Sequence, residues 1–392
     1  MEKILKFPKD FLWGTANSAY QIEGGIENCD WAKDFSAGKS CDHYNLYEKD
    51  FDLMKSLNQN AYRFSIEWSR IEPEAGKFNK KEIEHYQKVL EALKSRKIKT
   101  MVTLSHFTLP LWLAERGGWS SRKIIFYFPR FAKKIFDEFQ DLVDFWITIN
   151  EPLVYASFGY LEGRWPPHQK NLILFLKTIK NQETCHKKIY RIFHTFKPET
   201  RVGIAKNNSF FEPFNKESYL DKFSTKLYSF FGNEYFLNQI KNYLDFIGLN
   251  YYFHQKIKFP FAKKETENQK RGKRSDIGWE IYPPGIYYTL GELKKYNLPI
   301  YITENGVADA QDKLRQDFIE NHLYWIWQAI EEWIDVRGYF YWSLMDSFEW
   351  EKRFEPRFGL IEIDYKTFER KPRPSALYYA QICKDNQLIT NR

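Results

Sequence analysis

FWITINEP at residues 145–152 and LPIYITENG at residues 298–306 are the two stretches that decide the fold of this chain. Each is a short apolar run, rich in β-branched residues, that ends in a glutamate, Glu151 in the first stretch and Glu304 in the second. An Asn beside each glutamate and a Pro or Gly after it predict that a buried strand stops there and a loop begins. A lone acid at a strand end is commonly a solvated loop residue or a helix cap. Two such acids at the ends of two core strands instead favour a shared catalytic site.

Short apolar runs alternate with longer amphipathic segments along the whole chain, which is the order of strands and helices in a parallel sheet. Helices are predicted at Lys80–Ser95 and Ile124–Phe139, the second with Phe128, Phe131 and Ile135 three or four positions apart. Eight strands are predicted, at Leu12–Gly14, Ala61–Ser65, Lys99–Leu104, Phe145–Asn150, Arg201–Lys206, Phe246–Leu249, Ile300–Thr303 and Tyr339–Trp342.

This pattern predicts an α/β fold, a single (β/α)8 TIM barrel that spans residues 1–392 as one catalytic domain. No low-complexity linker divides the sequence into two domains. In such a barrel the active site lies at the C-terminal ends of the strands. Glu151 and Glu304 fall at these ends, after the fourth and seventh predicted strands.

The composition sets limits on the partners of the protein. Lys and Arg number 59 against 51 Asp and Glu, a formal net charge of +8 that is modest for 392 residues. This small excess of basic residues is explained by solubility, and neither a nucleic-acid nor a membrane partner is expected. Aromatic residues make up 19% of the chain. They fit a densely packed core or platforms that stack on sugar rings, and composition alone does not choose between these uses.

Sequence signals of a metal site, a disulfide framework or a membrane span are missing. The four cysteines show no CxxC pairing and no ligand spacing with the eight histidines. The first ten residues lack the apolar segment of a signal peptide, and no apolar run approaches about 18 residues. We therefore expect a soluble, cytoplasmic protein. The basic stretch from Phe261 to Ser275 could bind anions, but no aromatic interleaves its charges, so a solvated loop is favoured.

Further strings of sequence surround the two glutamates in a fixed order. They are FLWGTANSAYQIEG (11–24), NAYRFSIEWSRI (60–71), TLSHFTLPLWL (103–113), TINEP (148–152), DFIGLNYY (245–252), GWEIYPPG (278–285), ITENG (302–306), YWSLMDSFEW (341–350) and RFGL (357–360). A single motif of this length is weak. So many in one order make the chain resemble glycoside hydrolase family 1, the retaining β-glycosidases, nearly from end to end.

The resemblance implies a role for each glutamate. Glu304 would be the nucleophile that forms a glycosyl-enzyme, and Glu151 would be the general acid and then the general base. Arg63 matches the family position that keeps the nucleophile ionised, so we expect it to depress the pKa of Glu304. The charge of Glu304 should raise the pKa of Glu151 until the covalent ester removes that charge. Asn250 and Tyr252 match residues that orient the nucleophile.

The resemblance also implies a set of contacts to the nonreducing sugar. Asn150 should reach the 2-hydroxyl, where contacts strengthen in the transition state. Glu349 suits a grip on the 4- and 6-hydroxyls and would repel a 6-phosphate, which favours an unphosphorylated substrate. We expect a cis peptide bond between Trp342 and Ser343. The sugar contacts implied by the match are Gln21, His106, Asn150, Trp342, Glu349 and Trp350.

The chain departs from the family pattern at three positions, and it is shorter than usual. Phe107 stands where the family commonly has Trp, Ser347 where it has Asn, and Ile149 where it has Phe. We interpret these changes as tuning specificity or affinity. Residues are missing within 25–41 and 208–245, regions that match the loops at the entrance. A trimmed rim predicts a more open cleft, with weaker selection of the leaving group and room for bulky ones.

These features predict an exo-acting retaining β-glycosidase that releases terminal β-D-glucosyl or β-D-galactosyl residues, with fucosyl as a further candidate, from small glycosides and short oligosaccharides. No metal or organic cofactor is expected, because two carboxylates suffice. Two alternatives share the site: a transglycosylase that uses the same intermediate, and a sugar-binding protein that lost turnover. Barrel isomerases and aldolases fit less well, because a phosphate-binding Gly loop and a placed Schiff-base lysine are missing. The sequence leaves the oligomeric state open.

Overall fold

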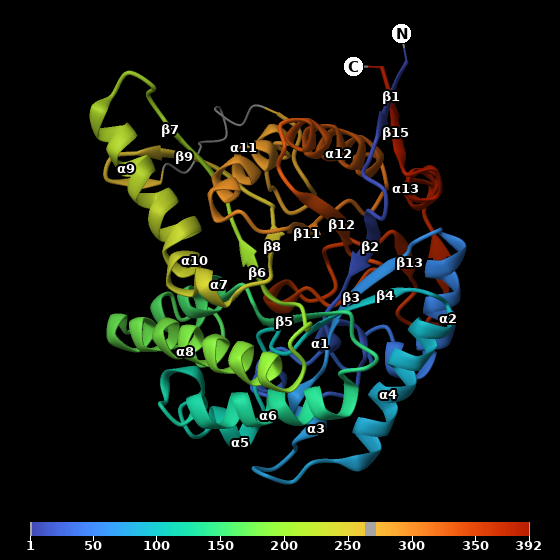
Figure 1. Ribbon diagram of the computed structural model, residues 1–392, viewed down its shortest axis with the longest axis vertical. Helices are drawn as coiled ribbons and strands as arrows, with labels where there is room; N and C mark the ends of the chain where they lie inside the picture. Colours follow the sequence, from blue (N-terminus) through green and yellow to red (C-terminus); the bar gives the residue numbers. More distant parts are fainter. Residues whose placement is uncertain (1, 263–271, 392) are drawn as a thin grey trace.

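A closed barrel of eight parallel strands forms the centre of the molecule (Figure 1). The computed structural model describes residues 2–262 and 272–391. The strands follow one another around the barrel in chain order, and β12 closes the circle by pairing with β2. The predicted TIM barrel is therefore confirmed. Its strands are β2 (Leu12–Ala16), β3 (Ala61–Ser65), β4 (Lys99–Thr103), β5 (Phe145–Asn150), β6 (Val202–Asn207), β8 (Phe246–Asn250), β11 (Ile300–Asn305) and β12 (Val336–Trp342).

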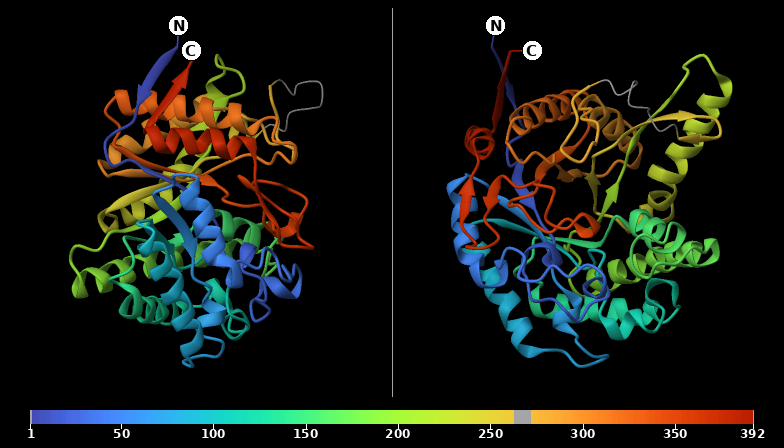
Figure 2. Two further views of the ribbon diagram at one scale, coloured as in Figure 1. Left: turned by 90° about the vertical axis from the view of Figure 1, so that its right-hand side faces the viewer. Right: turned by 180° about the vertical axis from the view of Figure 1, so that it is seen from behind.

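Helices surround the barrel on its outer side, so that the strands are covered all round (Figures 1 and 2). They are α1 (Ala19–Ile22), α2 (His43–Ser56), α3 (Trp68–Ile71), α4 (Lys80–Ser95), α5 (Leu111–Ala114), α6 (Ile124–Phe139), α7 (Pro152–Ala156), α8 (Leu172–Phe196), α9 (Tyr219–Ser229), α10 (Tyr235–Ile240), α11 (Pro284–Leu293), α12 (Arg315–Glu331) and α13 (Pro374–Asp385). Two π-helical turns continue α7 and α9, η3 (Ser157–Leu161) and η4 (Phe230–Glu234).

Three small sheets lie outside the barrel, and the sequence pattern did not predict them. The pair β1 and β15 brings the two ends of the chain together (Figure 1). The sheet of β7, β9 and β10 packs against α9, which stands away from the barrel in Figure 1 and in the right-hand view of Figure 2. The extra strands are β1 (Lys3–Lys6), β7 (Phe210–Pro213), β9 (His254–Lys258), β10 (Phe261–Ala262), β13 (Ile361–Ile363), β14 (Arg370–Pro372) and β15 (Gln387–Thr390).

The two helices predicted from apolar spacing, Lys80–Ser95 and Ile124–Phe139, occur as α4 and α6 with the same bounds. Helix α6 stays intact although it contains Pro129. A proline has no N–H, so the carbonyl of Ile125 loses its usual helical partner. The Nζ of Lys188 donates to this carbonyl at 3.2 Å and satisfies it.

Several barrel strands differ by one to three residues from the predicted bounds. Strands β2, β6, β8 and β11 run further into the polar residues at their C-terminal ends, whereas β4 stops one residue earlier. At β11 the strand continues through Asn305 because its side chain is fully bonded. Its Nδ2 donates to the Tyr251 carbonyl at 2.8 Å, and its Oδ1 accepts from the Tyr339 hydroxyl at 3.0 Å. Side-chain bonds to neighbouring strands thus extend the sheet beyond its apolar run.

The barrel interior is apolar where the strands begin and polar where they end. Phe145, Phe246 and Tyr301 fill the first layer, with ring centroids 5.2–5.8 Å apart in edge-to-face contacts. Arg63, further along β3, is only 1% exposed and lies in the polar layer. The aromatic layer therefore closes the barrel beneath the polar residues.

Three further expectations concern features away from the barrel. The basic stretch from Phe261 to Ser275 lies largely outside the described residues. All four cysteines are free thiols and are buried. In the described ranges, 2–262 and 272–391, no helix combines the length and the apolar character needed to cross a membrane.

Phe136→Ala should lower the free energy of unfolding by about 3–5 kcal/mol, the usual cost of emptying an aromatic site in a core. The Phe136 ring is fully buried on α6, 4.2 Å from the Phe193 ring of α8 and 5.8 Å from the Trp146 ring of β5. Urea unfolding followed by tryptophan fluorescence measures the change. Phe126→Ala is the matched control on the same helix, because Phe126 is 65% exposed. The control should change stability by less than about 0.5 kcal/mol, and equal midpoints for both variants would contradict this packing.

Candidate active site

A cavity of about 640 Å³ opens at the C-terminal ends of the barrel strands, where both glutamates lie. Three expected site residues, Gln21, Arg63 and Asn250, are buried behind the cavity wall and hydrogen-bond to residues in it. The other expected residues form part of the wall itself, namely His106, Asn150, Glu151, Tyr252, Glu304, Trp342, Glu349 and Trp350.

The guanidinium of Arg63 connects the ends of four strands. Its Nη1 donates to Glu304 Oε1 at 2.6 Å and to the Thr303 carbonyl at 3.1 Å. Its Nη2 donates to Asn150 Oδ1 at 2.6 Å, and its Nε donates to Thr103 Oγ1 at 3.2 Å. Strands β3, β4, β5 and β11 are thus joined through one buried cation. This places Arg63 where the sequence match expects a cation beside Glu304.

Both carboxylate oxygens of Glu304 accept hydrogen bonds. Oε1 accepts from Arg63, and Oε2 accepts from the Tyr252 hydroxyl at 3.0 Å. Burial raises the pKa of Glu304 above its ordinary 4.5, while Arg63, Tyr252 and Asn250 act to lower it. Arg63 thus lowers the pKa of Glu304 as expected, although the loss of solvent around this carboxylate outweighs the guanidinium.

Glu151 lies at a sharp turn from β5 into α7. Its φ of 43° falls in the left-handed region, and Pro152 after it occupies the first position of the helix. Its Oε1 accepts from Asn250 Nδ2 at 2.8 Å and from Asn207 Nδ2 at 3.3 Å. Burial and then the charge of Glu304 raise the pKa of Glu151 to about 7. A carboxyl group with this pKa holds its proton close to neutral pH.

Asn250 acts on a second carboxyl group besides the one expected. The sequence match assigns it to Glu304, and its amide nitrogen also lies 2.8 Å from Glu151 Oε1 and 3.2 Å from Asn150 Oδ1. Its Oδ1 accepts from Thr303 Oγ1 at 2.7 Å, which fixes the orientation of the amide. Because the amide also lowers the pKa of Glu304, Asn250 acts on both carboxyl groups.

His106 supports Asn150 from the end of β4. The Nδ2 of Asn150 lies 3.1 Å from His106 Nε2, and the imidazole stacks on Trp342 with ring centroids 5.8 Å apart. Burial and then Arg63 lower the pKa of His106 well below 6.5, so the ring is neutral. A neutral ring whose Nε2 accepts from Asn150 carries its proton on Nδ1. Within the described residues, this Nδ1 has no hydrogen-bond partner.

Glu349 is a third carboxyl group in the cavity. Gln21 Nε2 donates to Glu349 Oε2 at 3.2 Å and to the Phe348 carbonyl at 2.7 Å, so Gln21 contacts Glu349 from behind the wall. Burial and then the charge of Glu304 raise the pKa of Glu349 to about 8. Among the residues described, no group of three or more His, Cys, Asp or Glu side chains is placed to hold a metal ion.

Aromatic rings form much of the cavity wall. The peptide bond from Trp342 to Ser343 is cis, as expected. Trp350 packs against Trp31 and Phe107, with ring centroids 4.6 and 5.1 Å apart. A second group of rings in the wall consists of Phe253, Trp279 and Phe358. The cavity thus presents flat apolar surfaces beside its carboxyl groups.

A second hollow of about 590 Å³ adjoins this cavity. The two share Val154, Phe158, Asn207, Phe253 and Gln255. The segment 208–245 contributes apolar side chains to the second hollow, namely Phe211, Leu227, Tyr228 and Phe231. Phe231 is 58% exposed and Leu227 41% exposed. The cleft therefore continues from the carboxyl groups over an apolar surface that is open to solvent.

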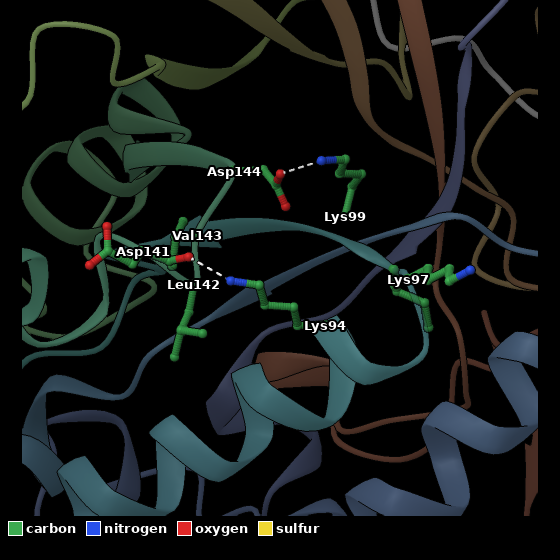
Figure 3. A pocket seen from close by; sticks show the side chains of 8 residues that line it. Lys94, Lys97, Lys99, Asp141, Leu142, Val143 and Asp144 are labelled. Atoms are coloured by element: carbon green, nitrogen blue, oxygen red, sulfur yellow. Dashed lines mark hydrogen bonds and ion pairs between the residues drawn. The ribbon is translucent and has the colours of Figure 1, made fainter.

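A third hollow, of about 250 Å³, lies at the opposite end of the barrel, where the strands begin (Figure 3). Lys99 at the start of β4 pairs with Asp144 at 2.7 Å, and Lys94 Nζ donates to the Asp141 carbonyl at 3.0 Å. These contacts join α4 and β4 to the loop before β5. Residues at this end of a barrel contribute to stability rather than to chemistry.

Several residues of the site were not predicted from the sequence. Asn207 donates to Glu151 from the last position of β6, one residue beyond the predicted end of that strand. A prediction that placed the end of β6 at Asn207 would have included this residue in the site, because polar residues at the C-terminal ends of the strands face the site. Phe158 reaches the cavity from η3 and Trp165 from the segment after it, and neither carries a local sequence signal.

Comparison with known proteins agrees with this geometry. The sequence model described as "Glycosyl hydrolase family 1" matches residues 4–240 and 234–388. The chain belongs to this family. It is a glycoside hydrolase that acts on O-glycosyl bonds.

Named relatives and solved structures match over almost the full chain. Beta-glucosidase A from Thermotoga maritima is 33% identical over 442 aligned positions, which cover 98% of this chain and 99% of the relative. The beta-galactosidase from Pyrococcus woesei is 32% identical, with 98% of each chain covered. The structure of a beta-glycosidase from Pyrococcus horikoshii has a TM-score of 0.93 at 38% identity, covering 98% of this chain and 96% of that one.

The Thermotoga maritima relative is longer than this chain, and the three departures from the family pattern can be located in the structure. The alignment to the Thermotoga maritima enzyme has 442 positions against 392 residues in this chain, so the relative contains residues that are missing here. Phe107 lines the cavity and packs against Trp165, with ring centroids 4.9 Å apart. Ile149 and Ser347 are buried but do not form part of the cavity wall. Of the three, Phe107 alone is placed to touch a ligand.

The decrease of kcat/KM at alkaline pH should follow the ionisation of Glu151. Activity on nitrophenyl β-glucoside should fall above pH about 7, where Glu151 loses its proton, and should fall again below the raised pKa of Glu304. Glu349 has the next higher pKa, about 8. Glu349→Gln should therefore keep the alkaline limb, whereas Glu151→Gln should remove it. Loss of the limb in Glu349→Gln alone would assign that ionisation to Glu349.

Proposed function

We propose that this family 1 enzyme is an exo-acting retaining β-glycosidase and that the whole chain serves as one catalytic domain. It would release terminal β-glucosyl, β-galactosyl or β-fucosyl residues from small glycosides. The proposal rests on the unequal surroundings of the two carboxyl groups. Glu304 is bound by a guanidinium, whereas Glu151 accepts from two amides and has a pKa of about 7.

In the first step Glu304 attacks the anomeric carbon while Glu151 protonates the leaving oxygen. The bonds from Arg63 and Tyr252 favour the ionised form of Glu304 and hold its two oxygens in place. The same negative charge helps to keep the proton on Glu151. These contacts favour the protonation state of each group that this step requires.

In the second step water attacks the glycosyl-enzyme. Formation of the ester neutralises Glu304 and removes one cause of the raised pKa of Glu151. Glu151 then ionises more readily and accepts the proton of the attacking water. The two amides that donate to its Oε1 favour this ionised form, so the same contacts serve the general base.

Recognition of the sugar falls to the polar residues of the cavity wall. Asn150 and His106 are held by Arg63 and by each other, and Glu349 is held by Gln21. These groups can bond to hydroxyls while Trp342 supports the apolar face of the pyranose ring. The Thermotoga maritima relative is named a beta-glucosidase and the Pyrococcus woesei relative a beta-galactosidase, which supports activity on both epimers.

The leaving group would extend from this pocket into the second hollow. That hollow is lined by Phe211, Leu227, Tyr228 and Phe231, so it suits an apolar rather than a charged leaving group. Exposed rings can contact many shapes, which supports broad acceptance of aryl and alkyl glycosides. Short oligosaccharides can also stack on these rings.

Azide should reveal the two roles through the stereochemistry of its products. Glu304→Ala should abolish hydrolysis of dinitrophenyl β-glucoside, and azide should restore turnover with release of α-glucosyl azide, because it attacks in place of the lost nucleophile. Glu151→Ala is the matched control. It should still form the glycosyl-enzyme from this good leaving group, and azide should then give β-glucosyl azide. NMR of the products measures both outcomes, and the same anomer from both variants would reject the assignment.

The apolar hollow should contribute to turnover of glycosides with long leaving groups. Phe231→Ser should lower kcat/KM for octyl β-glucoside by about tenfold, the effect of losing roughly 1–1.5 kcal/mol of apolar contact, and should leave methyl β-glucoside unchanged. Phe223→Ser is the control on α9, because Phe223 is 57% exposed and does not line the hollow. Equal octyl-to-methyl ratios in the wild type and in Phe231→Ser would contradict this placement of the leaving group.

A further inference from the structure

Lys206 is a buried lysine beside the acid/base that the mechanism above does not use. It is the penultimate residue of β6 and is only 2% exposed. Ala205 before it packs in the barrel interior, so the alternation of a strand directs Lys206 outward, under the segment 208–245. There it forms part of the wall of the apolar second hollow.

The ammonium group of Lys206 is satisfied by oxygens that carry no formal charge. It donates to the Gly232 carbonyl at 2.6 Å, to Asn208 Oδ1 at 3.3 Å and to the Asn207 carbonyl. Three acceptors match its three N–H donors. Among the described residues, no carboxylate forms an ion pair with it. A buried lysine in an apolar wall without such a partner is costly, which indicates a use for its charge.

These contacts join the leaving-group side of the cleft to the acid/base. Gly232 lies in η4, which carries the exposed Phe231 of the hollow. Asn207, whose carbonyl accepts from Lys206, donates through its side chain to Glu151 Oε1 at 3.3 Å. One side chain thus fixes η4 and the residue that contacts Glu151.

The charges of Lys206 and Glu151 also act on each other. Burial lowers the pKa of Lys206 to about 7, and the charge of Glu151 acts in the opposite direction. Electrostatic coupling is reciprocal, so a protonated Lys206 favours the ionised form of Glu151.

Other titratable groups near Lys206 are occupied elsewhere. Glu234 of η4 pairs with Lys295, and Glu292 of α11 accepts from Asn233 and Ser229. Further groups that face the hollow or the carboxyl cluster are Glu162, which follows η3, Tyr228 of α9, Arg63 and Glu304. Glu151 is the charged group that changes the pKa of Lys206.

We propose that Lys206 is a positioning residue for Glu151, which holds Asn207 and η4 in place and supplies a positive charge that favours the general-base form. This inference rests on the proposed role of Glu151. It assigns a function in the second chemical step to a residue outside the carboxyl cluster. It also couples the segment that receives the leaving group to the group that protonates it.

The test compares three variants of the full chain by pH profile and by leaving group. Lys206→Gln and Lys206→Met remove the charge, so each should move the alkaline limb of kcat/KM to higher pH, by about half a unit. Lys206→Arg keeps the charge throughout this pH range, so its limb should not move to higher pH. Lys206→Met also removes the hydrogen bonds and should lower kcat about tenfold on octyl β-glucoside, but less than about twofold on dinitrophenyl β-glucoside, which needs little acid assistance.

Control variants distinguish the proposed role of Lys206 from a merely structural role, and also from failure of the proposed function. Lys99→Met, at the opposite end of the barrel, should leave the limb unchanged. An unshifted limb in Lys206→Gln, with only a lower Tm, would reduce Lys206 to a structural support and overturn the inference. If Lys206→Met does not fold, the contrast between Lys206→Gln and Lys206→Arg decides the same point. An alkaline limb that persists in Glu151→Gln would instead reject the proposed function itself.

Discussion

The buried guanidinium of Arg63 is the interaction on which the rest of the site depends. Taking a cation and a carboxylate out of water costs several kcal/mol for each ion, and the four hydrogen bonds from this one side chain offset that cost. The same bonds fix the ends of β3, β4, β5 and β11 against one another. Loss of one charged partner would leave the other unpaired, at about 3–5 kcal/mol. The hydrogen bonds of Arg63 therefore stabilise both the geometry of the site and the charge of Glu304.

The Arg63 cation also explains how Glu151, Glu304 and Glu349 share one cavity. Burial favours the neutral form of each of them. Arg63 supports one negative charge and places it on Glu304, and that charge helps to raise the pKa of Glu151 to about 7 and of Glu349 to about 8. The position of the cation thus contributes, together with burial, to the different pKa values of three identical side chains. A sugar ester on Glu304 would lower the pKa of both other groups together.

The barrel and the membership of the site could be predicted from the sequence, because apolar periodicity and motif order are local properties. The ends of strands could not, since β11 runs on to Asn305 through side-chain bonds to other strands. For the same reason Asn207 was missed. The motif match placed Asn250 in the site, but Thr303 on the neighbouring strand sets the orientation of its amide. The direction of the Glu304 pKa depended on burial, which only the folded chain reveals.

The two sides of the cleft depend on different interactions. On the sugar side, polar groups are held in place by directional bonds between barrel strands. On the other side, the segment 208–245 offers exposed rings, and apolar contact depends on area rather than on direction. A change in that segment would therefore alter contact with a leaving group while the carboxyl groups keep their geometry. The two sides meet at Lys206, whose bonds to Gly232 and Asn207 pass from the apolar rim to the barrel.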